Sequence, residues 1–305
     1  MVMMLRGLVS ILCILAATSA MSGPDSDAHP PVLSAAGSLP FFYDLYTFRG
    51  EGDSTTVVAT IAVPVRRLRR ERRDNWVHYR FDVRFVLADT VRRSVFRTMD
   101  SVFVSVPRPL AGQHLLHTHI EIQAPPSTTT LQRVIVTDAA RAGVGQLYDS
   151  PFPIPDYSGT DLMLSDIAFG LPDATAGWTR RGVTLALLPT SQFPESSFDV
   201  YYEIYNLPAG NPYETEFSLQ LLDDSDEEGR AVRTLFSGES AARPDGSVVE
   251  LRRVESTLPK GRYRLTVTVT DKVSGQTAAR SRLVEVRGWG RGATMVPAMP
   301  YRGRD

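Results

Sequence analysis

Polar and apolar residues alternate along much of this chain, and this period of two constrains the fold more than any other feature of the sequence. Apolar residues occupy the odd positions between Tyr79 and Leu87, and residues Tyr263 to Val269 alternate in the same way. Alternation gives a strand one buried face and one wet face, as in antiparallel sheets. No stretch has the apolar spacing of an amphipathic helix, and 21 prolines and 22 glycines supply turn residues. We therefore predict an all-β chain.

The chain repeats short stretches of its own sequence. Three pairs occur in the same order: Ile61–Pro64 with Leu185–Pro189, Leu87–Asp89 with Leu221–Asp223, and Val134–Asp138 with Val267–Asp271. The repeats predict two tandem immunoglobulin- or fibronectin-like antiparallel β-sandwiches, at residues 39–149 and 162–287. Chance similarity between strands rich in valine and threonine is the alternative. Residues 150–161 contain three alternating prolines, which favour an extended, stiff spacer between the two domains.

The first 22 residues have the pattern of a secretory signal peptide. Arg6 precedes an apolar run from Leu8 to Ala17, and small residues follow it. This run is too short to span a bilayer, and no later apolar stretch is long enough to form a membrane segment. Cys13 lies in the middle of the run, whereas a lipid-modified cysteine would lie at its end. We expect an exported protein, periplasmic or extracellular, that is not a lipoprotein; an uncleaved N-terminal anchor is the alternative.

Two further segments lack the alternation that marks the strands. Residues 23–38 and the Gly/Arg-rich residues 288–305 are expected to be disordered. Within the second of these segments, Trp289 and Tyr301 are candidates for short docking residues.

Several strand patterns resemble those of a known group of proteins. They are the stretches Phe42–Phe48, Leu162–Phe169, Val200–Leu207 and Leu258–Val267. Together they resemble the β-rich region of bacterial GWxTD-domain proteins, which are exported proteins of largely unknown function. The similarity covers Leu39 to Val286, but the Gly-Trp-x-Thr-Asp motif itself is absent. Gly177–Arg180 is only a near match, in a predicted loop. The resemblance implies export and a sandwich architecture, and it implies no catalytic residue.

Arginines are concentrated in one short segment of a chain whose charges otherwise balance. With 33 Lys+Arg, 34 Asp+Glu and a net charge of −1, the chain lacks the basic surplus of a nucleic-acid-binding protein. Six arginines nevertheless fall in a predicted hairpin loop: Arg66, Arg67, Arg69, Arg70, Arg72 and Arg73. Guanidinium groups bind carboxylates and phosphates with two hydrogen bonds. We predict that this loop binds an acidic envelope protein or an anionic glycan; a solvated loop is the alternative.

A second candidate binding surface is a pair of tyrosines on a predicted strand. Tyr201 and Tyr205 alternate with the apolar residues of this strand and flank Glu203. If exposed, they would be suited to stacking on sugar rings or to contacting a protein partner. The alternative is that both faces of the strand are buried where the two domains meet.

A third candidate site consists of two histidines and a glutamate on one strand face. His117, His119 and Glu121 alternate with apolar residues, so their side chains share the polar face. Two imidazoles and a carboxylate are sufficient ligands for Zn²⁺ or another transition metal. No second histidine motif follows, and a strand face turned to water is the alternative.

No catalytic motif distinguishes the chain. The sequence lacks Gly-x-Ser-x-Gly, a phosphate-binding glycine loop after a strand, and any cysteine after residue 22. We therefore predict a non-enzymatic interaction or structural protein of the bacterial cell envelope that binds a protein partner and uses no cofactor. The alternatives are a carbohydrate-binding module and a metal-dependent enzyme that uses the His-x-His-x-Glu strand.

Overall fold

The computed structural model describes residues 39–142, 144–171, 176–189, 192–193, 197–222, 228–255, 259–286 and 295–297. The predicted signal peptide and the segment 23–38 lie outside the described residues. The described chain is built of β-strands and one short 3-10 turn, and none of it forms a helix long and apolar enough to cross a membrane. The predicted all-β class is confirmed.

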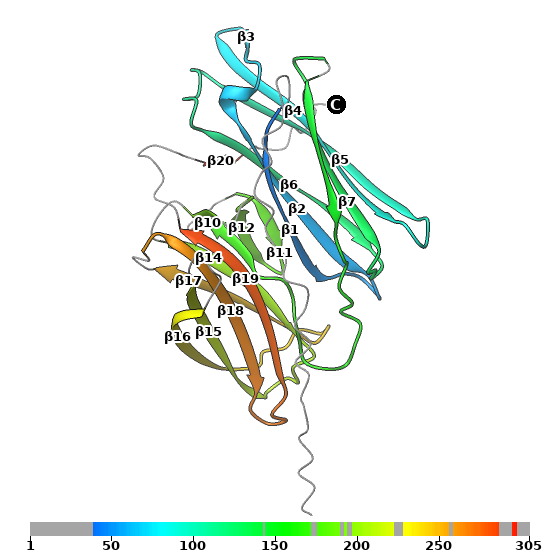
Figure 1. The fold of residues 1–305 in the computed structure, drawn as a ribbon, viewed down its shortest axis with the longest axis vertical. Helices are drawn as coiled ribbons and strands as arrows, with labels where there is room; N and C mark the ends of the chain where they lie inside the picture. The colour runs from blue at the N-terminus through cyan, green and yellow to red at the C-terminus, as the bar shows by residue number, and fades with distance from the viewer. Residues whose placement is uncertain are drawn as a thin grey trace, which may run out of the picture.

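The first sandwich contains two sheets (Figure 1). One sheet has the order β1 (Phe42–Arg49), β2 (Thr55–Pro64), β6 (Leu115–Ala124) and β20 (Met295–Pro297). The other has the order β5 (Val95–Val106), β4 (Trp76–Asp89), β7 (Thr130–Asp138) and β8 (Gly145–Pro151), and β3 (Glu71–Arg73) forms a short hairpin with the start of β4. Strand β20 runs parallel to β6, so the tail predicted to be disordered contributes a strand at residues 295–297. The remainder of that tail, from residue 288, lies outside the described residues.

The second sandwich also contains two sheets. One has the order β11 (Trp178–Arg180), β12 (Val183–Leu187), β10 (Ala168–Leu171), β14 (Ser197–Tyr205) and β17 (Ser247–Glu255), with β9 (Met163–Leu164) paired to β14. The other has the order β13 (Gln192–Phe193), β19 (Thr277–Val286), β18 (Gly261–Asp271), β15 (Pro212–Leu222) and β16 (Glu228–Glu239). Gly177–Arg180, expected in a loop, instead leads into strand β11.

The alternating segments form the centre of each sandwich. Along β4 the odd-numbered residues from Tyr79 to Leu87 are buried, and along β18 the odd-numbered residues from Tyr263 to Val269 are buried. These side chains pack in two separate apolar cores, one for each sandwich. The period of two therefore correctly predicted which face of each strand points inward.

The two sandwiches share one strand order. The order β1-β2-β6 opposite β5-β4-β7-β8 corresponds to β10-β14-β17 opposite β16-β15-β18-β19. The similar stretches Val134–Asp138 and Val267–Asp271 lie at the ends of β7 and β18, which hold corresponding places. The pair of Ile61–Pro64 and Leu185–Pro189 does not correspond, because Ile61–Pro64 lies on β2 and Leu185–Leu187 lies on the additional strand β12. Whether the sandwiches belong to the immunoglobulin-like type stays a prediction.

The proline-rich segment between the sandwiches packs against the first of them. Ile154 bridges Ser127, and both Ile154 and Tyr157 are buried. The hydroxyl of Thr55 donates to the carbonyl oxygen of Pro155 at 2.6 Å. The segment predicted to be an extended, stiff spacer is therefore docked on the first sandwich.

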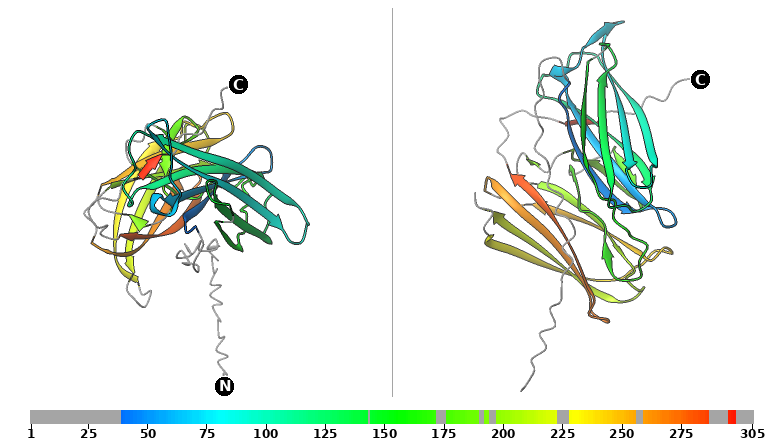
Figure 2. Two further views of the ribbon diagram at one scale, coloured as in Figure 1. Left: turned by 90° about the horizontal axis from the view of Figure 1, so that it is seen from above. Right: turned by 45° about the vertical axis from the view of Figure 1, so that its right-hand side comes forward.

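The outer face of the β1-β2-β6 sheet covers the β12-β10-β14 sheet of the second sandwich (Figures 1 and 2). A third apolar cluster fills this contact: Tyr46, Phe48 and Val58 from the first sandwich, and Ala168, Trp178, Leu185, Leu187 and Tyr201 from the second. All of these side chains are buried, so the contact resembles a core more than a flexible hinge between domains.

Candidate functional site

The arginine loop, residues Arg66–Arg73, extends from the end of the first sandwich. The chain leaves β2 at Pro64, makes the short 3-10 turn η1 (Val65–Arg67) and then enters β3. Val65 and Leu68 are buried in the core of the sandwich, while all six arginines of the loop are exposed. Val65 and Leu68 therefore anchor the loop in the core, and the guanidinium groups of the arginines lie in solvent.

Asp138 holds the backbone of the arginine loop. Its side chain is fully buried, and its Oδ2 accepts hydrogen bonds from the backbone N–H of Arg69 at 2.9 Å and from Nε of Arg141 at 2.7 Å. Nη2 of Arg141 also donates to the backbone carbonyl of Arg67. A buried charge with several donors fixes the loop and leaves its arginines oriented outward.

The arginine loop carries little compensating charge. Only Arg73 forms an ion pair with a described residue, at 3.6 Å to Asp74, and both side chains are more than 80% exposed (83% and 88%). An ion pair at this exposure contributes little, since both charges remain in water. Glu71, the one acidic residue within the loop, pairs with Arg80 at 3.1 Å. The loop therefore presents an excess of positive charge.

An exposed tryptophan lies beside the arginines and was not singled out from the sequence. Trp76 is 45% exposed and pairs across the β3–β4 hairpin with Arg73. Asp74 and Asn75, both with positive φ (51° and 66°), form the tight turn between them. The sequence alone could have indicated this exposure. The odd-numbered residues from Tyr79 to Leu87 form the buried face of β4, and Trp76, at an even-numbered position, lies on the opposite face. Tryptophan and arginine are among the residues most enriched in the energetic centres of protein interfaces.

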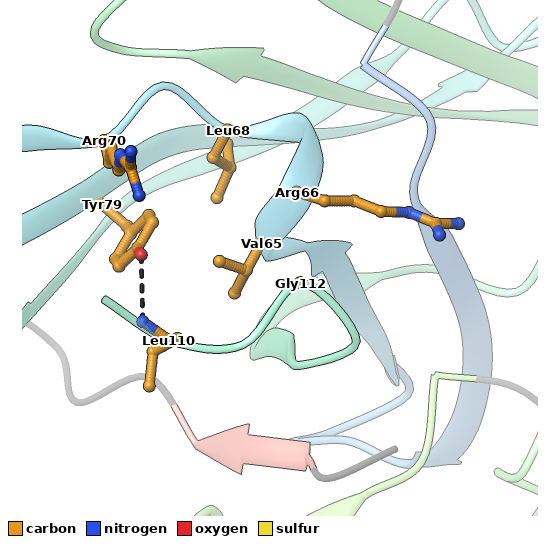
Figure 3. A pocket seen from close by; sticks show the side chains of 7 residues that line it. All are labelled: Val65, Arg66, Leu68, Arg70, Tyr79, Leu110 and Gly112. Carbon is orange, nitrogen blue, oxygen red and sulfur yellow. Dashed lines mark hydrogen bonds between the residues drawn. The ribbon is translucent and has the colours of Figure 1, made fainter. Parts of the chain in front are cut away.

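A small cavity lies under the arginine loop (Figure 3). Its volume is about 300 Å³, and it is lined by Val65, Arg66, Leu68, Arg70, Tyr79, Leu110 and Gly112. The backbone N–H of Leu110 donates to the hydroxyl of Tyr79 at 3.2 Å, which closes one side of the cavity. The arginine loop thus borders a concave surface.

The tyrosine pair is not available to a partner in this structure. Tyr201 and Tyr205 have no exposed surface, because β14 lies between its own core and the first sandwich. Their hydroxyls donate to the two carboxylate oxygens of Glu203 at 2.6 and 2.8 Å. Burial and the neighbouring carboxylate both raise the pKa of each tyrosine, so both stay protonated. The expectation of an exposed binding pair is wrong, and the alternative of burial between the domains describes the structure.

Glu203 is the centre of an ionic network between the sandwiches. Its carboxylate, which has no exposed surface, accepts hydrogen bonds from Arg180 Nε at 2.5 Å and Nη2 at 3.1 Å, and lies 3.8 Å from Arg181. Nη2 of Arg180 also donates to the backbone carbonyl of Arg49 at 2.7 Å, across the domain contact. The buried charge is therefore paired and hydrogen-bonded, as a buried charge must be.

A second ionic network crosses the same contact. Oδ2 of Asp166 accepts hydrogen bonds from the N–H and hydroxyl of Thr47 at 2.9 and 2.6 Å, and Oδ1 accepts one from Nε of Arg280 at 2.7 Å. Burial alone would raise the pKa of Asp166, but the guanidinium groups of Arg280 and Arg282 hold it below its usual value. Arg282 also pairs with Asp44 at 2.6 Å. These pairs connect β1 with β19 and fix the relative orientation of the sandwiches.

The three predicted metal ligands share one face of β6, as expected, but they do not form a metal site. Glu121 accepts the indole N–H of Trp178 from the second sandwich, and the described residues contain no group of three potential ligands placed to bind an ion. His117 is buried, and its Nε2 has no hydrogen-bond partner among the described residues. The prediction of a metal centre at His117, His119 and Glu121 is therefore corrected: this face packs toward the second sandwich.

Burial of His117 makes the stability of the protein depend on pH. Desolvation, with a smaller contribution from His119, lowers the pKa of His117 from 6.5 to about 4. The unfolded chain therefore binds a proton more readily than the folded chain, and stability falls as the pH drops below 6.5 and levels off near 4. We expect this residue to contribute a loss of about 3 kcal/mol between pH 7 and pH 4.

The variant His117→Asn isolates this contribution. Urea unfolding at several pH values measures it as the difference between the wild-type and variant free energies, which should change by about 3 kcal/mol over this range. Parallel curves for the two proteins would show that His117 titrates normally.

Comparison with known proteins leaves the family open. No family model matches the chain, and no curated protein matches it. Solved structures with partial similarity include a Bacteroides uniformis β-glucuronidase (TM-score 0.26, 6% identity, 76% of this chain and 26% of that chain). A red sea bream transglutaminase is similar at a TM-score of 0.21 and 13% identity, over 80% of this chain and 31% of that chain. This chain thus spans less than a third of the length of these proteins, and similarity at this level carries no argument about function.

Proposed function

We propose that this chain is a non-catalytic interaction protein of the bacterial cell envelope that binds an acidic protein partner through the arginine loop. One observation carries the proposal: six exposed arginines lie on a loop held by Asp138, and only one of them has an ion pair with a described residue. The excess positive charge attracts an anionic surface, and the loop backbone, which Asp138 holds, does not need to be ordered on binding.

Trp76 adds the apolar component that a protein interface needs. Charge complementarity mainly increases the association rate and orients the partner, while buried aromatic side chains supply much of the binding free energy. Trp76 and Arg73 lie side by side on the β3–β4 hairpin, at the end of the first sandwich. This combination supports a protein partner over a polymer that is recognised through charge alone.

The network between the sandwiches supports a structural role for the second domain. The buried pairs of Glu203 and Asp166 and the apolar cluster around Trp178 hold the two sandwiches together. A partner bound at the arginine loop would therefore be held at a fixed position relative to the second sandwich.

Cross-linking capture from the native cell envelope tests the proposal with matched variants. The loop variant carries Arg66→Gln, Arg70→Gln and Arg72→Gln. The control variant carries Arg84→Gln, Arg93→Gln and Arg97→Gln, three exposed arginines outside the loop, so both lose the same charge. The tagged chain from residue 23 to 305 is the bait in each case.

We expect the wild-type and control proteins to capture the same acidic protein in stoichiometric amount, and the loop variant to lose at least nine-tenths of it, equivalent to roughly 1.4 kcal/mol. Equal capture by all three proteins would place any interface elsewhere. Capture of anionic glycan in place of protein would favour the carbohydrate-binding alternative.

A further inference from the structure

Two stacked tyrosines connect the sheets of the first sandwich at one side. Tyr43 is on β1 and Tyr148 is on β8, and each of these strands is the last of its sheet. The ring centroids are 5.6 Å apart, with an interplanar angle of 24°. Phe41, which is 2% exposed, packs against both rings, at 5.9 Å from Tyr43 and 4.7 Å from Tyr148 between centroids. The two phenol rings are therefore held nearly parallel and in contact.

The same two tyrosines are the ones that solvent reaches. The chain has 11 tyrosines, and one of them, Tyr301, lies outside the described residues. Among the described tyrosines, Tyr43 and Tyr148 are partly exposed and all the others are buried. A reagent in solvent that oxidises phenols would thus reach, within the described part of the chain, two tyrosines that already contact each other.

The surroundings of the pair hold one phenol in place and keep both protonated. Nε2 of the buried Gln132 donates to the hydroxyl of Tyr43 at 2.8 Å and to the hydroxyl of Ser150 at 2.9 Å. Burial raises the pKa of both Tyr43 and Tyr148. Each phenol is therefore oxidised by loss of an electron together with its proton. No cysteine follows residue 22, so no thiol beyond that position competes for the oxidant.

We propose that Tyr43 and Tyr148 form an oxidative cross-linking site, at which a haem peroxidase with hydrogen peroxide joins the two rings as dityrosine. Each phenol loses one electron and its hydroxyl proton, and the two radicals couple through a carbon–carbon bond between ring positions ortho to the oxygens. The two ortho hydrogens then move as protons to the oxygens, which restores both phenols. The hydrogen peroxide accepts the two electrons and the two protons and becomes two molecules of water.

The new bond would stabilise the first sandwich as a disulfide stabilises many secreted domains. It links β1 to β8, at the edges of the two sheets, and closes a loop of about 100 residues. A cross-link over a loop of this length stabilises a fold mainly because it restricts the unfolded chain. With no cysteine after residue 22, the rest of the chain cannot form a disulfide that would do the same.

The experiment treats the full chain from residue 23 with a haem peroxidase and hydrogen peroxide. We expect dityrosine fluorescence and a mass lower by two hydrogen atoms. No covalent dimer should form on a denaturing gel, because the second tyrosine belongs to the same molecule. Tandem mass spectrometry should find Tyr43 bonded to Tyr148. The midpoint temperature of thermal unfolding should rise by about 10 °C, as expected for a cross-link over a long loop.

Two variants remove one phenol each and keep the aromatic ring. Tyr43→Phe and Tyr148→Phe should both lose the dityrosine fluorescence and the rise in midpoint temperature. In Tyr43→Phe, Gln132 retains Ser150 as its acceptor. Tyr263→Phe is the matched control, because it removes a tyrosine that is only 4% exposed, and it should cross-link as the wild type does. Circular dichroism verifies that all proteins are folded before oxidation.

Three results would overturn the inference: no dityrosine in the wild-type protein, dityrosine that persists in either Tyr43→Phe or Tyr148→Phe, or cross-links that form only between molecules. An unchanged midpoint temperature of the cross-linked protein would likewise overturn its stabilising role. The pair lies outside the arginine loop, so each of these results leaves the proposed function standing.

Discussion

Replacement of Trp178 by alanine is expected to lower the free energy of unfolding by about 3–5 kcal/mol, as for other buried tryptophans. The side chain is 1% exposed, and its ring lies 5.1 Å from that of Phe48 and 5.3 Å from that of Tyr201, measured between centroids. Its indole N–H also donates to Glu121 in the first sandwich. The substitution therefore opens a cavity between the domains and removes a hydrogen bond across them.

Urea unfolding followed by far-ultraviolet circular dichroism measures the loss, and Trp76→Ala is the control. Trp76 is 45% exposed and lies at the end of a short hairpin, so its removal should lower the free energy of unfolding by only about 1 kcal/mol. Equal effects of the two substitutions would contradict the packing described for the domain contact.

The second large loss of unfolding free energy is expected when the Glu203 carboxylate is removed. Glu203→Ala leaves Arg180 without its ion pair, and the hydroxyls of Tyr201 and Tyr205 without acceptors, inside the domain contact. Removing one partner of a buried charge pair typically destabilises a protein by about 3–5 kcal/mol, since the remaining charge is uncompensated. We expect a loss of this size.

The matched comparison for Glu203→Ala is Glu216→Ala. Glu216 pairs with Arg233 at 3.5 Å, and their side chains are 34% and 68% exposed, so its removal should cost less than about 1 kcal/mol. Thermal unfolding of the two variants measures these losses, and the midpoint temperature should fall much further for Glu203→Ala than for Glu216→Ala. A Glu203→Ala protein as stable as wild type would mean that the network adds nothing to the association of the sandwiches.

The fold was predictable because strand alternation is a local property. Tyr79 to Leu87 and Tyr263 to Val269 reveal their buried faces without reference to any distant residue. The match of Ile61–Pro64 to Leu185–Pro189 failed for the opposite reason. It compared short valine- and leucine-rich stretches, and β2 and β12 occupy different places in their sheets.

The candidate sites were harder to predict because their surroundings come from distant segments. Tyr201 and Tyr205 share their strand face with Asp199 and Glu203, and a face that carries two carboxylates has the pattern of an exposed face. Their acceptor Glu203 is on the same strand, but Asp44 meets Arg282 across 238 positions of sequence. The alternation of residues along a strand cannot predict an ion pair between residues so far apart in the sequence. The six arginines of the arginine loop, by contrast, are contiguous in sequence, so their common exposure could be predicted without reference to distant segments.

The affinity of the captured partner at low and high salt tests the central claim most directly. Screening weakens charge–charge attraction as ionic strength rises, so the wild-type dissociation constant should increase from about 50 mM to about 300 mM salt. The variant with Arg66, Arg70 and Arg72 replaced by glutamine should bind at least about tenfold more weakly at low salt and show a smaller salt dependence. Equal affinity and equal salt dependence of the two proteins would contradict the assignment of the arginine loop as the binding site.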